Sequence, residues 1–174
     1  MARKVAVPAL GAAFAGGFFA GEITVDGERF AVVVAPKAEG EKMDLRYKVK
    51  ARDVFDGTDS DDEGFANSET INDDNHPAAQ FCRSLRIGEH DDWYLPSRDE
   101  LMIIWRSLGP NRKKTPEPFR AGGAEAFEER WYWSSTEYAR FSYYAWVVVF
   151  LGGCQHYLNK SNQFAVRAVR RLKL

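Results

Sequence analysis

Apolar, β-favouring residues near the amino terminus form two short runs, residues 18–25 and 29–35, which flank Asp26-Gly27. Asp-Gly between two such runs is a strong signal for a tight hairpin, because both residues tolerate a positive φ. We therefore expect an amino-terminal β-hairpin. A further apolar run at residues 45–49 predicts one more strand.

Two segments in the middle of the chain have the apolar spacing of helices. A proline at position 77 suits the first turn of a helix over about residues 77–85. Ser97 and Glu100 form a capping box, in which each side chain accepts a hydrogen bond from the other residue's backbone N–H. The helix that begins there should end near Leu108, because a Gly-Pro pair follows.

Polar segments separate these elements. Residues 53–75 hold nine acidic residues and no Lys or Arg, and they predict a long, solvated surface loop. Residues 111–130 carry mixed charge, two prolines and a glycine pair, which predict a loop with one short helical turn. Both segments should connect regular elements.

The last third of the chain is rich in aromatic residues and contains a second hairpin signal, Gly152-Gly153, between residues 145–151 and 154–160. A two-residue turn predicts three cross-strand pairs, which are Leu151 with Cys154, Val149 with His156, and Val147 with Leu158. Because side chains alternate along a strand, these six residues share one face. The other face carries Trp146, Val148 and Phe150, which make the better core set.

Two alternatives stay open for the face of Val147 and Leu158. Another part of the chain covers it, or it is exposed as an apolar patch, which would indicate a binding surface. Residues 164–172 then predict a closing strand. Its arginines, Arg167, Arg170 and Arg171, are expected at the sheet edge, where charge discourages aggregation and can pair with the acidic loop.

Composition fits a single soluble domain over residues 1–174, with an amino-terminal hairpin region (1–50) and a core (51–174). Hydrophobic residues make up 45% and charged residues 28%, which is ordinary for a globular protein. The net charge of −1 hides an asymmetry, because residues 138–174 hold six basic residues and no acidic one. Five of the six lie at Lys160 or beyond, after most of the aromatic residues, which argues against nucleic-acid binding.

The sequence offers no candidate catalytic, metal or cofactor site. The three histidines are scattered without the spacing of metal ligands. An acidic run at residues 59–64 imitates an EF-hand loop, but Thr70 stands where such a loop needs a bidentate Glu. The run Ser134-Ser135-Thr136 has no nucleophile elbow or obvious base, and we expect it to form hydrogen bonds within a turn.

Two further features bear on location. Cys82 and Cys154 are too few for a disulfide framework, which indicates a reducing compartment. Arg3-Lys4 before an apolar run imitates a secretory signal, but Pro8 and several glycines interrupt the run. No segment of the sequence is apolar and long enough to span a bilayer. We therefore expect neither a signal peptide nor an integral membrane protein.

Three separated motifs resemble a bacterial and phage domain family with a C-type-lectin fold. They are Trp93-Tyr94-Leu95-Pro96-Ser97-x-x-Glu100-Leu101, Tyr132-Trp133-Ser134-Ser135-Thr136, and Val166-Arg167-Ala168-Val169-Arg170. The resemblance covers about residues 53–171, and it implies an α+β, C-type-lectin-like fold with mixed antiparallel strands, two main helices and long loops. Such domains occur in surface adhesins, in prophage tail regions and in the variable proteins of diversity-generating retroelements.

In the retroelement-linked members, a reverse transcriptase miscopies adenines, so Asn codons become many residue types on a ligand-facing surface. The resemblance, together with the predicted hairpin face, implies nine ligand-facing residues: Tyr143, Tyr144, Val147, Val149, Leu151, Cys154, His156, Tyr157 and Leu158. The scaffold would then include Trp93, Trp133, Trp146 and Phe150. The implied function is ligand recognition by a receptor or adhesin of phage or prophage origin.

The expected partner is a protein or cell-surface ligand, with no nucleic acid and no membrane. Other tail or virion proteins, and self-association into a homo-oligomer, are left open, and the location would be a virion tail or the bacterial cytoplasm before assembly. One alternative is a non-variable lectin-like adhesin or tail-assembly module with a fixed ligand. Another is an oxidase of the formylglycine-generating type, which uses paired cysteines. We expect no enzyme, because no motif of such an oxidase accompanies Cys82 or Cys154.

Overall fold

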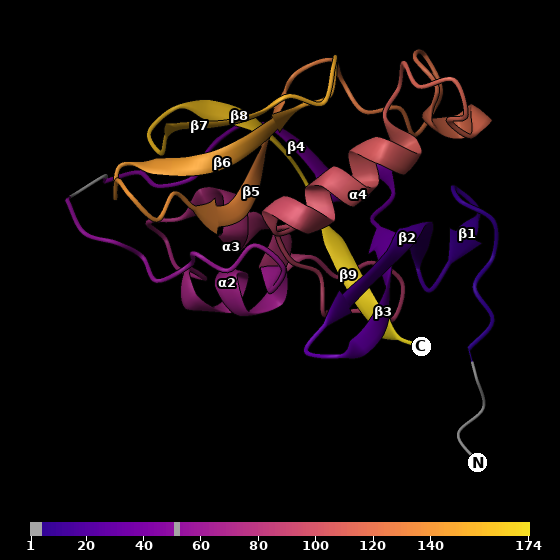
Figure 1. The fold of residues 1–174 in the computed structure, drawn as a ribbon, viewed down its shortest axis with the longest axis horizontal. Helices are drawn as coiled ribbons and strands as arrows, with labels where there is room; N and C mark the ends of the chain where they lie inside the picture. Colours follow the sequence, from indigo (N-terminus) through magenta and orange to yellow (C-terminus); the bar gives the residue numbers. More distant parts are fainter. Residues whose placement is uncertain (1–4, 51–52) are drawn as a thin grey trace.

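The computed structural model describes residues 5–50 and 53–174, which build two β-sheets and several helices (Figure 1). The first sheet has the order β1-β2-β3-β9, with strands Ala13–Phe14, Gly17–Val25, Glu28–Val34 and Val169–Lys173. The second has the order β4-β8-β5-β6-β7, with strands Glu41–Arg46, Gln163–Arg167, Trp131–Glu137, Tyr144–Val149 and Gln155–Asn159. The predicted α+β class is confirmed. Arg3-Lys4 and the boundary expected at residue 51 lie outside the described residues.

The helices are α1 (Lys37–Gly40), α2 (Gly64–Thr70), α3 (Pro77–Ser84) and α4 (Arg98–Leu108), with a 3₁₀ turn at Glu117–Phe119. The predicted helices at 77–85 and 97–108 are confirmed as α3 and α4, and the short turn lies in the expected loop. None of the helices among the described residues is long and apolar enough to cross a membrane.

Local signals explain the elements that the sequence predicted best. The β2–β3 hairpin closes through Asp26 and Gly27, with φ of 50° and 79°, as a tight turn requires. Helix α4 begins with the predicted capping box, because Glu100 N–H donates to Ser97 Oγ (3.3 Å) and Ser97 N–H donates to Glu100 Oε2 (2.8 Å). Each signal needs only residues close in sequence, so it survives in the folded chain.

The acidic segment at residues 53–75 is more ordered than predicted. Helix α2 forms inside it, and several of its carboxylates make ion pairs while remaining partly exposed. Asp61 accepts a hydrogen bond from Arg98 (2.6 Å), and Glu63 accepts one from Arg171 (2.7 Å). The expectation of a loop was wrong where α2 forms, whereas the expected pairing of a last-strand arginine with this segment is confirmed by Arg171 and Glu63.

The predicted closing strand at residues 164–172 is in fact two strands in two sheets. Strand β8 ends at Arg167, and β9 begins at Val169 after the chain passes through Ala168, which bonds to Gly40 and Ala35. Arg167 therefore lies at the junction of the sheets and not at an edge. It is buried, and its guanidinium contacts Glu125 (2.6 Å) and Glu41 (3.4 Å).

The five-stranded sheet is covered on both faces. Helix α4 packs between this sheet and β2, with Leu101, Ile104 and Leu108 against Val148 and Phe150 (Figure 1). The opposite face packs under α2 and α3, in a cluster that contains Trp133, Trp93 and Val147. Strand β5 is therefore almost entirely buried, whereas β6 is buried at Ala145, Val147 and Val148 and partly exposed at its other three residues.

Candidate functional site

Five partly exposed aromatic side chains form a continuous group on strands β6 and β7 and on the loop before them. We call this group the aromatic surface, and it consists of Tyr138, Phe141, Tyr144, Trp146 and Tyr157. Tyr138 and Tyr157 stack in parallel, with ring centroids 4.0 Å apart and an interplanar angle of 4°. The remaining ring contacts range from 5.4 to 6.3 Å and are mostly edge-to-face.

Strand geometry explains this gathering. Trp146 of β6 pairs directly with Tyr157 of β7, and Tyr144 lies two residues before Trp146, so all three side chains share one face. The loop between β5 and β6 then folds back and adds Tyr138 and Phe141, and Phe141 is 56% exposed. On β6, Tyr144 and Trp146 thus alternate with the buried Ala145 and Val147.

Arg98 at the start of α4 borders the aromatic surface. Its guanidinium lies 4.7 Å from the Trp146 ring and pairs with Asp61 (2.6 Å). A cation over an indole face is a favourable contact. Arg98 therefore holds Trp146 on one side and joins the surface to the acidic segment.

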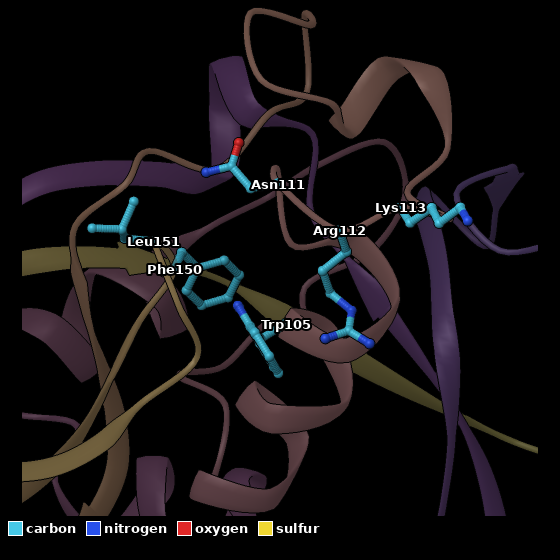
Figure 2. A pocket seen from close by; sticks show the side chains of 6 residues that line it. All are labelled: Trp105, Asn111, Arg112, Lys113, Phe150 and Leu151. Atoms are coloured by element: carbon cyan, nitrogen blue, oxygen red, sulfur yellow. The ribbon is translucent and has the colours of Figure 1, made fainter.

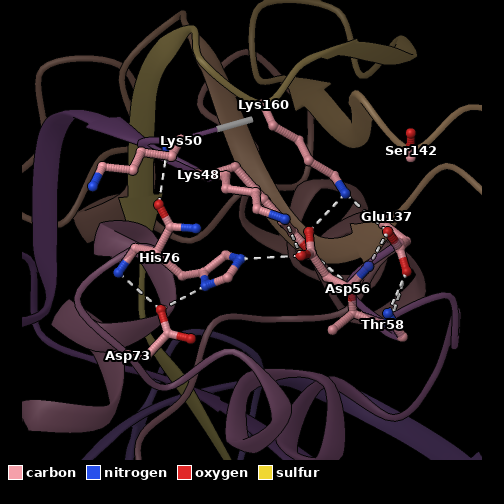
Figure 3. Close-up of polar contacts among 12 residues, drawn as sticks. Lys48, Lys50, Asp56, Thr58, Asp73, His76, Glu137, Ser142 and Lys160 are labelled. Atoms are coloured by element: carbon pink, nitrogen blue, oxygen red, sulfur yellow. Dashed lines mark hydrogen bonds and ion pairs between the residues drawn. The ribbon is translucent and has the colours of Figure 1, made fainter. Parts of the chain in front are cut away.

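A buried ionic cluster joins segments that are distant along the chain (Figure 3). Lys160, which is fully buried just after β7, contacts Asp56 (2.7 Å) and Glu137 (2.8 Å), and Lys48 also pairs with Asp56. Glu137 further accepts hydrogen bonds from three successive backbone N–H groups, those of Asp56, Gly57 and Thr58, at 2.7–3.0 Å. The cluster ties the loop after β4 to the end of β5 and to the turn after β7.

These contacts shift the carboxyl pKa values downward. Burial alone would raise the pKa of Glu137, but the hydrogen bond from Lys160 and the backbone donors outweigh it and lower the pKa. Burial likewise opposes ionisation of Asp56, yet its hydrogen bonds with His76, Lys160 and Lys48 hold its pKa well below the usual range. Both carboxylates are thus charged near neutral pH, and their role here is to anchor loops.

A cavity of about 300 Å³ lies beside the tip of the β6–β7 hairpin (Figure 2). Trp105, Phe150 and Leu151 form its apolar part, and Asn111, Arg112 and Lys113 form its polar part. Arg112 stacks over Trp105 at 4.5 Å, and no carboxylate lines the cavity. Its charge favours an anionic group over a cationic one.

A second cavity, of about 280 Å³, opens on the opposite face of the sheet, where Trp131, Val149 and Phe164 line it together with Asp44, Glu129 and Arg130. This is the carboxyl end of the face that the hairpin pattern predicted as ligand-facing. His156 borders this end, with its ring 6.3 Å from Trp131. The predicted face is therefore open at this end and along β7, where His156 is exposed and Leu158 is partly exposed.

The structure divides the nine predicted ligand-facing residues into three groups. Tyr143, Leu151, Cys154 and His156 are exposed, and Tyr144, Val149, Tyr157 and Leu158 are partly exposed. Val147 has 0% exposure, and the expectation that it faces a ligand was wrong. It pairs with Trp133 on β5 and packs in the cluster under α2 and α3, because β6 has strands on both sides and helices over both faces.

The observed hairpin register also differs from the predicted one. Val147 pairs with His156 and Ala145 with Leu158, a shift of two residues, because the turn spans Phe150 to Gly153 instead of the glycine pair alone. A two-residue shift keeps every side chain on its predicted face. The predicted grouping of residues by face is therefore confirmed, although the predicted cross-strand pairs were wrong.

Among the predicted scaffold residues, Trp93, Trp133 and Phe150 are fully buried, but Trp146 is only partly buried and belongs to the aromatic surface. Sequence reasoning missed Tyr138 and Phe141 altogether. Their aromatic character was visible, but their approach to β6 and β7 depends on how the loop folds back. No pattern along the chain carries that information.

The residues considered for catalysis lie apart. Cys82 is buried in α3, where burial raises the pKa of its thiol, while Cys154 is exposed beside the hairpin tip, and both are free. The Ser134 hydroxyl donates to Trp146 O (2.9 Å), and the Thr136 hydroxyl donates to Ser60 O (2.9 Å). Both hydroxyls therefore make structural hydrogen bonds to the backbone. No group of three or more His, Cys, Asp or Glu side chains suited to a metal ion occurs within residues 5–50 and 53–174.

One antiparallel sheet and one mixed sheet, packed against helices, define the class as an α+β domain. The chain belongs to the Lcl C-terminal domain family, which matches residues 42–170. No curated protein matches the chain.

Among solved structures, the chain is similar to a fimbrial protein from Bacteroides ovatus ATCC 8483, with a TM-score of 0.50 and 14% sequence identity. The likeness covers 80% of this chain but only 35% of the fimbrial protein. At this identity, it shows a shared fold alone.

Proposed function

We propose that this chain is a ligand-binding module of the adhesin type, which recognises a cell-surface ligand on the aromatic surface. The observation that carries the proposal is the continuous group of partly exposed rings on an outer part of the sheet. Exposed apolar groups of this kind usually mark binding sites, because water-facing rings lose little rotamer freedom when a ligand covers them.

The chemistry of the surface indicates a ligand with an apolar face and a polar rim. The rings offer flat apolar area, and the hydroxyls of Tyr138, Tyr144 and Tyr157 have no hydrogen-bond partner among residues 5–50 and 53–174. Each hydroxyl is thus free to donate to a ligand and to accept from it. A surface saccharide has this chemistry, and a protein ligand is the alternative.

The similarity to a fimbrial protein supports a location at a cell surface, as does membership of a lectin-like family. The narrower hypothesis is a phage-encoded variable protein with a diversified surface. Buried Val147 does not fit a diversified position, because a residue in the core cannot vary freely. A neighbouring reverse transcriptase gene and a near-repeat of the coding sequence for residues 138–171, differing at adenines, would support this narrower hypothesis.

Binding to saccharide arrays and to intact cells tests the proposal. Tyr157→Ala and Phe141→Ala should each weaken binding about tenfold or more, because central aromatic contacts carry most of an interface's energy. Leu151→Ala, at a side chain of equal exposure (56%) on the hairpin tip, is the matched control and should bind normally. Equal binding by all three variants would place the ligand elsewhere.

We also propose that the chain has no catalytic activity. The separate environments of Cys82 and Cys154 support this proposal, since the oxidase alternative requires two cysteines that act together. Incubation with a peptide thiol substrate and oxygen tests it. Turnover that is lost in both Cys82→Ser and Cys154→Ser would reverse the assignment.

A further inference from the structure

Strand β7 is an outer strand of the five-stranded sheet and is bonded on one side only, to β6. Two backbone hydrogen bonds just beyond the ends of β7 show which of its residues bond to β6. Val149 N–H donates to Cys154 O (3.0 Å), and Lys160 N–H donates to Tyr143 O (2.9 Å). In an antiparallel ladder, alternate residues face the partner strand, so the even-numbered residues of β7 bond to β6.

The backbone groups of Gln155, Tyr157 and Asn159 therefore point away from the sheet. Within the described parts of the chain, none of these three N–H groups has a hydrogen-bond acceptor. Tyr157 O accepts a bond from the His156 ring (2.9 Å), and Asn159 O accepts one from Asn162 N–H (2.9 Å), but each carbonyl keeps a second lone pair. The outer edge of β7 therefore offers backbone hydrogen-bond donors and acceptors at every second residue. The outward-facing groups of another β-strand have the same spacing.

The other sheet edges are protected. Strand β4 carries Glu41, Lys42, Asp44 and Arg46 and has an irregular register, while β1 has only two residues. Strand β9 carries three basic residues and is partly covered through a bridge to Tyr94. Charge, bulges and short length are the usual protections against strand pairing. Strand β7, with the sequence Gln-His-Tyr-Leu-Asn, has no charged residue, no proline and no bulge.

We propose that β7 pairs with β7 of a second copy of this chain, antiparallel, about a twofold axis at Tyr157. In this register Tyr157 faces Tyr157 of the second copy, Gln155 faces Asn159, and His156 faces Leu158. All three outward N–H groups of each copy then find acceptors. Amide faces amide and ring faces ring, with no like charges opposed, so the edge is self-complementary as an isologous interface requires.

Pairing in this register joins two five-stranded sheets into one. The side chains of Gln155, Tyr157 and Asn159 lie on the same face as Trp146, so the two aromatic surfaces become neighbours. A ligand with repeated units could then engage both copies and gain from a high effective concentration. A single pair of short strands buries little area, so we expect weak association in solution. The pairing does not depend on the proposed ligand function.

Two double variants with substitutions at the same positions test the register. Gln155→Lys with Asn159→Lys places lysine opposite lysine across the axis, whereas Gln155→Lys with Asn159→Glu places lysine opposite glutamate. Both variants lose the bonds that the Asn159 side chain makes to Ser161, so that cost is matched. Sedimentation velocity between about 1 µM and about 1 mM covers the range of a weak dimer.

The wild-type chain should dimerise within this range, and the lysine–lysine variant should show a dissociation constant at least about tenfold higher than the lysine–glutamate variant. Hydrogen exchange at the amides of residues 155, 157 and 159 should slow as the wild-type concentration rises. A wild-type chain that stays monomeric throughout, or equal association by the two variants, would overturn the proposal. If hydrogen exchange at these amides slows only when a different protein is added, the proposed self-pairing is also overturned.

Discussion

Strands β6 and β7 are hydrogen-bonded neighbours in one hairpin, yet the fold uses them in opposite ways. Val147 and Val148 of β6 are fully buried on opposite faces of the sheet. On β7, His156 is exposed, although it pairs with the buried Val147. The difference arises because β6 lies between two strands under helices, whereas β7 is the last strand. Position in the sheet thus decides exposure more than the apolar character of a strand.

The largest test of this comparison uses Val147 and the residue paired with it, His156. Val147→Asp should cost about 5 kcal/mol or more and unfold most of the protein, because it places a charge in an apolar cluster. His156→Asp should change stability by less than about 1 kcal/mol, since the position is exposed. Denaturant unfolding measures both. Similar losses in the two variants would mean that the strands do not differ as described.

A second test concerns the residue where β7 ends and the chain turns back into the interior. Lys160→Met should cost about 3–4 kcal/mol, because it leaves Asp56 and Glu137 without their shared cation. Lys113→Met, at an exposed lysine with no ion pair among the described residues, is the control and should change stability by less than about 0.5 kcal/mol. A loss below about 1 kcal/mol in Lys160→Met would show that the cluster contributes little to stability.

The smallest expected effect is the pH dependence of stability. The pKa values of Asp56 and Glu137 are lower in the folded than in the unfolded chain, so their stabilising contribution is present above the unfolded values, about 4, and is lost as the pH falls toward the folded values. The wild-type chain should therefore lose about 1–2 kcal/mol more than Lys160→Met between pH 6 and about pH 3. Thermal unfolding of both proteins across this range measures the difference. Parallel curves would contradict the assigned role of Lys160.

Sequence reasoning succeeded where a signal involves residues close along the chain. The Asp26-Gly27 hairpin, the Pro77 start of α3 and the Ser97–Glu100 box of α4 are all local, and all three are present. The family motifs also predicted an α+β lectin-like fold, which the match over residues 42–170 supports. These features need no knowledge of distant contacts.

Sequence reasoning failed where distant segments decide the outcome. Arg167 was expected at an edge, but the chain crosses from one sheet to the other immediately after it and Glu125 pairs with it inside. Helix α2 was hidden in an acidic stretch that looked like a loop. The aromatic surface could be anticipated only in part, through Tyr144 and Tyr157, because Tyr138 and Phe141 reach it by a loop conformation.

The amino-acid sequence by itself determined the hairpin, the starts of helices α3 and α4, and the grouping of β6 and β7 side chains by face. These features depend on turn chemistry, on a proline or a capping box in the first turn, and on the two-residue period of a strand. Only the tertiary structure decided which of those faces meets water. Both faces of β6 are apolar enough to be buried, so exposure was settled by which strands and helices came to lie beside them. That arrangement depends on pairings such as Val147 with Trp133 and Lys160 with Glu137, which join residues far apart along the chain.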